Sequence, residues 1–428
     1  MGRPCLLMRP GNANPTRTVL IILQAQRPLF FACSPSSHHM GCQVSRPSGP
    51  PRLPFDIYLE VPNHLRTSLA EDRKTLRALA LCCRALRDAS QRSLFSSMSY
   101  AYPPADFDLL VKTLKSHAKF LRAIIDSPDR LALYVRSYSQ QRLALDPKLR
   151  SAAKALTLGH RTKRVLLWTL SEIALPLMVN LKNLIISPLM FHPSAPILLR
   201  HCTFQLVSFT WTGYESDQAL YSTFLPTQRN LLDLDINSCT YNDRPTLPDG
   251  LCPFLKSVAC PLSALERIST TRPIIALYVA PDISRPPRTD LMSATERDGC
   301  IAALRKIRYL WISLLPQFQQ FTNGIMLHNV AALRLRVFKI EDPSLLSQFP
   351  NLRSLRLSNP WVTDVDTSAF HDTAVHAFNQ IPKLQVIVII AKVAQSNIVW
   401  QFSPRYGGGV AEKATSLENY VDTEWWKP

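Results

Sequence analysis

One segment decides how most of this chain folds: PNLRSLRLS, residues 350–358. Its apolar residues Leu352, Leu355 and Leu357 follow the template apolar-x-x-apolar-x-apolar. In extended backbone, successive side chains point to opposite faces, so Leu355 and Leu357 face one side while Arg356 faces solvent. The segment therefore predicts a short strand that is buried on one face and needs neighbours to cover it.

The same template recurs along the chain from about residue 150. Clear copies are PKLQVIVII at 382–390, VNLKNLIIS at 179–187 and RNLLDLDIN at 229–237, and weaker ones include Phe204, Val207 and Phe209. The first positions of ten copies fall at 153, 181, 204, 231, 255, 274, 307, 330, 352 and 384, so their spacing averages about 26 residues. No single unit can bury its own apolar face, so units at this period stack into a solenoid.

Between the copies lie stretches with helical patterning, such as residues 291–306 and 366–381. Together with the strands, the repeats resemble irregular leucine-rich repeats, although a regular Asn or Cys after each strand is missing. The resemblance implies an α/β solenoid over residues 151–391, with short parallel strands whose outward face binds a protein.

The stretch before the repeats has a different pattern. It contains LPFDIYLEVPNHL at 53–65 and TLRALALCCRALRDASQRSLF at 75–95. Pro54 and Asp56 suit the first turn of a helix, where a missing donor is harmless and a carboxylate meets the positive end of the dipole. The apolar spacing predicts one helical stripe over 57–65 and a second helix that runs from Leu76 through Cys83 to Leu86. Leu94 and Phe95 then close a further short helix.

Residues 53–97 resemble an F-box, the helical module that attaches substrate receptors to the Skp-type adaptor of cullin–RING ubiquitin ligases. Two positions depart from the family pattern: Pro62 lies where the first helix should continue, and Leu86 stands in place of the usual Trp. The resemblance implies that the adaptor is bound by Leu53, Pro54, Ile57, Leu59, Val61, Leu65, Leu76, Leu79, Cys83, Leu86 and Leu94.

An F-box followed by leucine-rich repeats implies a non-catalytic substrate-recognition subunit of an SCF-type E3 ubiquitin ligase. The helices would bind the Skp-type adaptor and, through it, the cullin–RING ligase, and the repeats would bind an unknown protein substrate. The alternative is a leucine-rich-repeat scaffold without ligase attachment, which would be favoured if Pro62 ends the first helix at Val61.

Candidate substrate-binding residues lie in or just after the repeat strands. Asp233 and Asp235 flank Leu234 and share the outward face of one strand, while Tyr309, Trp311 and Trp361 fall in or near strand ends. Trp211 and Tyr214 have similar positions. Exposed aromatic side chains on such a face are candidates for binding hot spots, and packed ridge residues are the alternative.

Composition limits the remaining possibilities. The net charge of +18 is concentrated in residues 1–52, with six Arg and no acidic residue, and in 101–165, with thirteen basic and five acidic residues. The second segment is either a solvated helical linker or a nucleic-acid surface. The ten cysteines contain no C-x-x-C pair, which favours reduced thiols in the cytoplasm or nucleus.

No motif for hydrolysis, metal-dependent proteolysis or nucleotide binding occurs, so we expect no catalytic residues, no metal site and no cofactor. His371 and His376 lie five residues apart, which does not place them on a shared helical face. No apolar run reaches the length of a membrane span.

The predicted organisation has five parts. They are a disordered basic arm at 1–52, an F-box-like domain at 53–97, a helical connector at 98–150, the solenoid at 151–391, and a C-terminal cap or tail at 392–428. Within the connector, the apolar run 131–135 is of strand type. In the tail, Trp425 and Trp426 either cap the last repeat or form a peptide-like contact.

Overall fold

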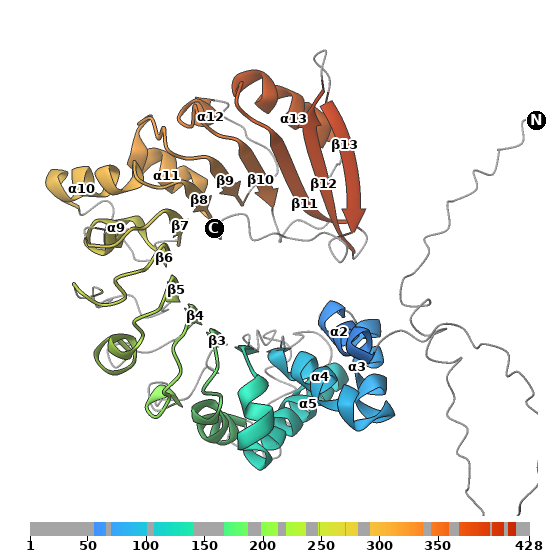
Figure 1. Ribbon diagram of the computed structural model, residues 1–428. Helices are drawn as coiled ribbons and strands as arrows, with labels where there is room; N and C mark the ends of the chain where they lie inside the picture. The colour runs from blue at the N-terminus through green and yellow to red at the C-terminus, as the bar shows by residue number, and fades with distance from the viewer. Residues whose placement is uncertain are drawn as a thin grey trace, which may run out of the picture. The chain divides into compact units, whose positions relative to one another are not determined.

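A computed structural model describes the chain in segments (Figure 1). They are residues 55–65, 70–100, 107–140, 167–186, 198–212, 220–236, 247, 249–269, 271–280, 292–336, 344–358, 368–393, 396–405 and 410–416. The chain divides into two compact units, Met1–Ser97 and Met98–Pro428. The arm predicted at 1–52 and the residues Trp425 and Trp426 lie outside the described segments.

The described segments of the first unit form the helices α2 (Phe55–His64), α3 (Ala70–Cys82) and α4 (Arg84–Ser96). The helix α4 packs against both of the others. Leu76, Leu79 and Leu86 are the main buried side chains of this unit, with exposed fractions of 7% or less. Removing such apolar side chains from water is the dominant favourable term for so small a core.

The helix α2 does not end at Pro62. It continues to His64, so the proline lies in its last turn. There the missing N–H removes one hydrogen bond close to the end of the helix and leaves the turns before it intact. The carbonyl of Pro62 accepts a hydrogen bond from Oγ of Ser93 at 3.1 Å, which ties the end of α2 to α4.

The prediction of one continuous helix from Leu76 to Leu86 is wrong. Cys83 has extended backbone, with φ −155° and ψ 164°, and it separates α3 from α4. Leu86 therefore belongs to α4, which also includes Leu94 and Phe95 in place of the separate short helix that was expected. Apolar spacing alone missed this break, because both helices bury side chains at compatible positions.

In its described segments the second unit is built on a 13-stranded sheet in which the strands follow one another in chain order. All pairings from β2 to β11 are parallel. The strands are β1 (Ser97–Tyr100), β2 (Ser137–Gln140), β3 (Asn183–Ile186), β4 (Ser208–Trp211), β5 (Asp233–Ile236), β6 (Ser257–Cys260), β7 (Ala276–Val279), β8 (Tyr309–Ile312), β9 (Ala332–Leu335), β10 (Ser354–Ser358), β11 (Val386–Val393), β12 (Ser396–Pro404) and β13 (Val410–Ser416). This arrangement confirms the predicted α/β class with a solenoid-like parallel sheet.

The strands stack in step. One continuous row of buried core side chains crosses the sheet: Leu184, Phe209, Leu234, Val258, Leu277, Leu310, Leu333, Leu355 and Ile387. Nine of the ten predicted template copies fall on described residues, and each overlaps one of the strands β3 to β11. The copy that begins at Ala153 lies outside the described segments.

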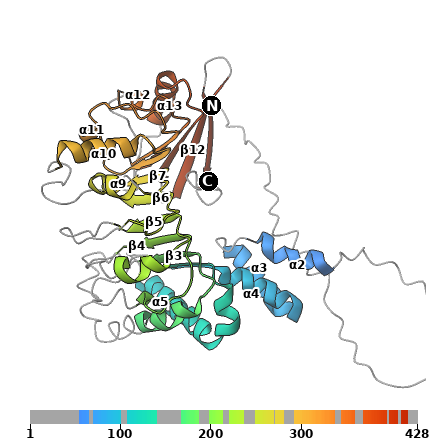
Figure 2. The ribbon, with the colours of Figure 1, turned by 60° about the vertical axis from the view of Figure 1, so that its left-hand side comes forward.

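Helices and turns cover one face of this sheet. In Figures 1 and 2 the strands line the inner side of the second unit, and the helices that connect them lie on its outer side. The connecting elements include α5 (Phe107–Asp126), η1 (Pro128–Ala132), η2 (Leu175–Leu177), η3 (Leu220–Phe224), η4 (Leu225–Thr227), α9 (Leu262–Ser269), α10 (Ala294–Leu304), α11 (Leu315–Thr322), α12 (Ser344–Ser347) and α13 (Ser368–Gln380). We call the sheet face opposite these helices the inner face.

Two of these helices confirm helical patterns seen in the sequence. The helix α10 lies within residues 291–306, and α13 lies within 366–381. A capping box starts α10: Oγ of Ser293 accepts from the N–H of Glu296 at 3.2 Å, and the Glu296 carboxylate accepts from the N–H of Ser293 at 3.0 Å. Two of the donors at this helix end are thereby satisfied.

Asparagines that precede the first Leu of two copies bond to the turn before the neighbouring strand. The side-chain amide of Asn351 donates to the carbonyl of His328 at 2.8 Å, and that of Asn180 donates to the carbonyl of Leu133 at 3.0 Å. The recurring Asn-Leu dipeptide therefore has a structural role, because it satisfies carbonyl groups in the preceding turns.

Two strand assignments differ from those predicted. The run 131–135 is not a strand: η1 ends at Ala132, and the strand β2 begins at Ser137. Pro128 fixes φ at the start of that turn, and the N–H of Leu131 donates to the carbonyl of Ser127 at 2.9 Å. Apolar content alone did not distinguish a buried turn from a strand.

In β4 the predicted core positions are shifted. Leu206, Phe209 and Trp211 take the three template positions and are fully buried, while Val207 is 36% exposed. Trp211 is therefore a core residue and not an exposed one. Tyr214 lies outside the described segments.

The end of the sheet changes direction. The strand β12 pairs antiparallel with β11, and β13 pairs antiparallel with β12. The predicted cap or tail at 392–428 thus contains strand residues that the repeat template did not indicate. Within the described segments, none of the helices combines the length and the apolar character that crossing a bilayer requires.

Candidate functional site

The inner face carries two parallel rows of side chains, because the strands stack without a shift in register. The first row contains Ser208, Asp233, Ser257, Ala276 and Tyr309. The second contains Thr210, Asp235, Ala259, Tyr278, Trp311, Arg334 and Arg356. Each position lies between or just before the buried residues of its strand, so the two rows are where the sheet can present side chains to a ligand.

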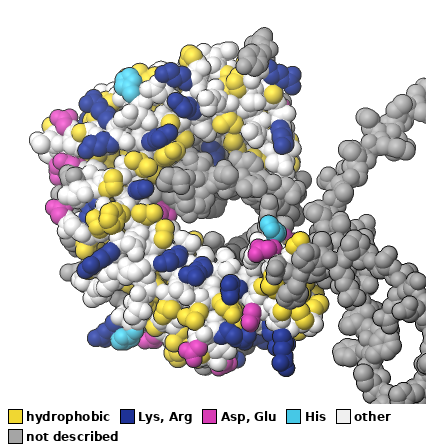
Figure 3. Space-filling view, viewed as in Figure 1, with side chains coloured by type: hydrophobic (Ala, Val, Ile, Leu, Met, Phe, Trp, Pro, Cys, Tyr) yellow, Lys and Arg dark blue, Asp and Glu magenta, His cyan; other side chains and the backbone are white. Residues whose placement is uncertain are grey.

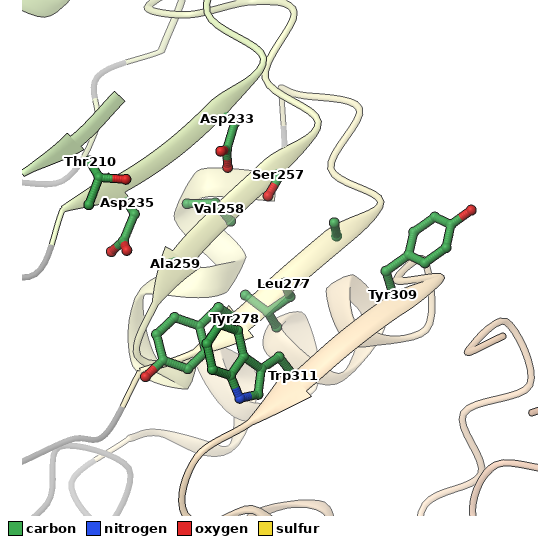
Figure 4. Close-up of a pocket in the computed structure, with 11 residues that line it drawn as sticks. Thr210, Asp233, Asp235, Ser257, Val258, Ala259, Leu277, Tyr278, Tyr309 and Trp311 are labelled. Carbon is green, nitrogen blue, oxygen red and sulfur yellow. The ribbon is translucent and has the colours of Figure 1, made fainter. Parts of the chain in front are cut away.

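A pocket of about 130 Å³ lies between β4 and β8 on this face (Figure 4). Ser257, Ala259 and Ala276 are short side chains from β6 and β7, and they leave the hollow between larger neighbours. Asp233 and Asp235 lie on one side of it, and Tyr278 and Trp311 lie on the other. We call this hollow the acidic–aromatic pocket.

The two carboxylates of the pocket differ in their partners. Asp233 accepts a hydrogen bond at Oδ2 from Oγ of Ser208 at 2.7 Å. Asp235 has its Oδ1 atom buried, and within the described part of the chain this atom accepts no hydrogen bond. Burial, and secondly the negative charge of Asp233, raises the pKa of Asp235 to about 6. Asp235 is thus ionised at neutral pH in a setting that disfavours its charge.

The aromatic side of the pocket is a stack that crosses three strands. The rings of Tyr278 and Trp311 have centroids 4.2 Å apart and an interplanar angle of 30°. The guanidinium carbon of Arg334 lies over the Trp311 ring, 4.0 Å from its centroid. A cation over an indole ring is attracted by the ring quadrupole, so Arg334 closes one end of this stack.

The charge along the second row changes sign. Asp235 lies on β5 at one end, and Arg334 and Arg356 lie on β9 and β10 at the other. Burial is the main cause that raises the pKa of Tyr278, and the charge of Asp235 adds to it. A hydrogen bond with Ser313 and, less strongly, the charges of Arg336 and Arg334 lower this pKa. The phenol of Tyr278 therefore stands between an acidic and a basic part of the inner face.

The structure brings four of the five candidate substrate-binding residues together. Asp233, Asp235, Tyr309 and Trp311 all line the acidic–aromatic pocket, and Trp361 lies outside the described segments. Seven further lining residues were not among the candidates, and Thr210, Ser257 and Tyr278 are the polar ones among them. The sequence pattern could have indicated these three residues, because each occupies an outward-facing position of its own template copy.

The candidate adaptor-binding residues of the first unit fall into classes by exposure. Ile57 is 46% exposed, and Cys83 is also exposed. The half-buried members are Leu59, Val61, Leu65 and Leu94. The buried members are Leu76, Leu79 and Leu86, which support the helices from inside. Leu53 and Pro54 lie outside the described segments.

The described part of the basic segment 101–165 includes α5. Lys112, Lys115, Lys119 and Arg122 are exposed there at spacings that place them along one side of the helix. Elsewhere on the face shown in Figure 3, Lys and Arg side chains are spread out and do not gather into one patch. The sequence alternatives for this segment, a solvated helix or a nucleic-acid surface, both remain predictions.

No group of three or more His, Cys, Asp or Glu side chains within the described segments is placed to hold a metal ion. His371 and His376 are both exposed on α13. The sequence matches no model of a known protein family and no curated protein.

Proposed function

We propose that this chain is a non-catalytic receptor that connects a protein substrate to a ubiquitin ligase. In this proposal, α2, α3 and α4 bind a Skp-type adaptor, and the inner face of the sheet binds the substrate. The observation that carries the proposal is the order of the two units: a unit whose described helices, α2 to α4, resemble an F-box is followed by a solenoid-like sheet.

The first unit has features that support adaptor binding. The side chain of Leu81 is 83% exposed and that of Ile57 is 46% exposed, so apolar surface remains uncovered on a unit with a small core. Exposed apolar side chains of this kind are available to a partner that covers them. The continuation of α2 through Pro62 also removes the observation that would have favoured a scaffold without ligase attachment.

The second unit has features that support substrate binding. Its inner face carries carboxylates and aromatic side chains around a hollow, and aromatic residues are enriched among the hot spots of protein interfaces. A curved stack of parallel strands also offers an extended surface of the kind that solenoid proteins use to bind their partners.

Co-purification with a Skp-type adaptor tests the proposal. We expect the full chain to retain a co-expressed adaptor, and we expect the double variant Leu53→Ala with Pro54→Ala to lose it. Ile57→Asp should also lose it, because a charge replaces an exposed apolar contact. Phe254→Asp is the matched control, since Phe254 is an exposed apolar residue of the second unit, and it should leave retention unchanged. Failure of the wild-type chain to retain the adaptor would overturn the proposal.

A further inference from the structure

The size of the acidic–aromatic pocket limits what can enter it. Its volume is about 130 Å³. Pockets for cofactors and other organic ligands are usually about 300–1,000 Å³. A single side chain from a bound protein fits the smaller space better than a complete small-molecule ligand does. The pocket also opens on the inner face, where an extended segment can place one side chain into it.

The charge of the pocket selects among side chains. Asp235 has a buried carboxylate oxygen that accepts no hydrogen bond within the described segments, and the neighbouring charge that acts on it is the carboxylate of Asp233. A buried acceptor without a donor is unfavourable, and two nearby carboxylates make it more so. A positively charged donor that entered the pocket would relieve both effects, while an acidic side chain would worsen them.

The aromatic side of the pocket selects in the same direction. Trp311 lies between Tyr278 on one side and Arg334 on the other, so the chain already places a guanidinium against this stack. Tyr278 is the member of the stack that lies toward Asp235, with only the short side chain of Ala259 between them in the row. The methylene groups of a basic side chain can pack on the tyrosine ring while its charged end reaches the carboxylate.

We infer that the acidic–aromatic pocket binds the side chain of a lysine or arginine from a protein that lies along the inner face. Asp235 receives the charged end, Asp233 adds negative charge, and Tyr278 packs against the apolar stem. The inference rests on the proposed function only in taking the ligand to be part of a protein substrate.

The test uses blocked amino acids and the full chain. The probes are N-acetyl-lysine methylamide and N-acetyl-arginine methylamide. N-acetyl-norleucine methylamide controls for the apolar stem, and N-acetyl-glutamine methylamide controls for a neutral donor. Binding is followed by ligand-detected NMR at neutral pH. We expect one or both cationic probes to bind in the millimolar range and both neutral probes to bind at least fivefold more weakly. The stronger cationic probe identifies the preferred residue.

Two variants and a control locate the binding. Asp235→Asn keeps the shape of the side chain and should weaken the cationic probes at least fivefold. Ala259→Leu fills the hollow and should abolish their binding. Asp298→Asn removes an exposed acidic residue of α10 and should change nothing. A thermal melt of each variant confirms that it is folded.

Either of two results overturns the inference: neutral and cationic probes that bind equally or not at all, or cationic binding that Asp235→Asn leaves unchanged. These results are separate from the proposed function, because the probes require no adaptor. If the chain retains the adaptor but does not bind the cationic probes, only the inference about the pocket is refuted. A chain that binds the cations but no adaptor refutes only the ligase connection.

Discussion

Tyr278 and Trp311 stack on neighbouring strands of the inner face, with ring centroids 4.2 Å apart. The contact depends on the parallel register of β7 and β8, which places the two residues side by side although 32 positions separate them in the chain. This stack forms one side of the acidic–aromatic pocket, and Arg334 closes its far end.

The contact between Trp311 and Arg334 should contribute measurably to stability. A double-mutant cycle with Trp311→Leu and Arg334→Met is expected to give a coupling free energy of about 0.5–1 kcal/mol, because a cation over an indole ring is favourable even at partly exposed sites. Urea unfolding of the four proteins measures it. A coupling near zero would mean that the arrangement contributes no net free energy.

Asp235→Asn should stabilise the protein at neutral pH. Folding raises the pKa of Asp235 from 3.8 to about 6, so between these values the folded state binds more protons than the unfolded state does. The stability of the wild-type protein therefore falls as pH rises from about 4 to about 6, and the variant should gain about 1–3 kcal/mol at pH 7.

Unfolding free energies from pH 4 to pH 8 measure this effect, with Asp298→Asn as the exposed control. An Asp235→Asn variant less stable than wild type at pH 7 would show that the carboxylate is favourably paired after all.

His117 should produce the opposite slope at acidic pH. Its ring is fully buried, stacks on Tyr100 with centroids 4.2 Å apart, and lies 2.6 Å from the hydroxyl of Tyr138 through Nε2. Tyr138 donates to Oε1 of Gln140 at 3.3 Å, so its oxygen is available to accept the proton on Nε2.

Burial lowers the pKa of His117 to about 3, below the value of 6.5 that it has in an open chain. The unfolded state therefore binds more protons between these values, and stability is lost as pH falls below 6.5, by up to about 1.4 kcal/mol per pH unit. His117→Phe should remove this component. The check is the same pH series of unfolding free energies, and a variant that keeps the full wild-type slope would exclude His117 as its source.

The asparagine of a repeat should matter only where its amide reaches a neighbouring repeat. Asn351→Ala removes the hydrogen bond to the carbonyl of His328, and it also removes the acceptor for Lys383 at 2.6 Å. We expect a loss of about 0.5–1.5 kcal/mol. Asn230 has the same template position but makes no hydrogen bond within the described segments, so Asn230→Ala should cost clearly less. Equal losses for the two variants would contradict this explanation.

The sequence could predict the strands of the solenoid because their pattern is local. In PNLRSLRLS the alternation correctly placed Leu355 and Leu357 in the core, and the same alternation marked Asp233 and Asp235 as outward-facing. Arg356 between the two leucines was expected to face solvent, but it is only 6% exposed. The pocket could not be predicted in full, because its shape depends on which residues of distant repeats become neighbours. Tyr278 lies beside Trp311 only through the register of two strands.

The wrong core positions predicted for β4, and the two strands that were not predicted at the end of the sheet, have local causes. The stretch that leads into β4 has apolar residues at 204, 206, 207, 209 and 211, so two overlapping sets of positions fit the template and spacing alone cannot choose between them. In the structure the set with Leu206 and Trp211 is the buried one. The antiparallel strands β12 and β13 were not predicted, because their sequences do not follow the repeat pattern.

A titration of purified Skp-type adaptor into the full chain tests the central claim most directly. We predict a one-to-one complex with a dissociation constant in the micromolar range or tighter, which Ile57→Asp weakens at least tenfold and Asp235→Asn leaves unchanged. Absence of binding at adaptor concentrations well above micromolar, or equal binding by Ile57→Asp, would contradict the assignment of this chain as a ligase receptor.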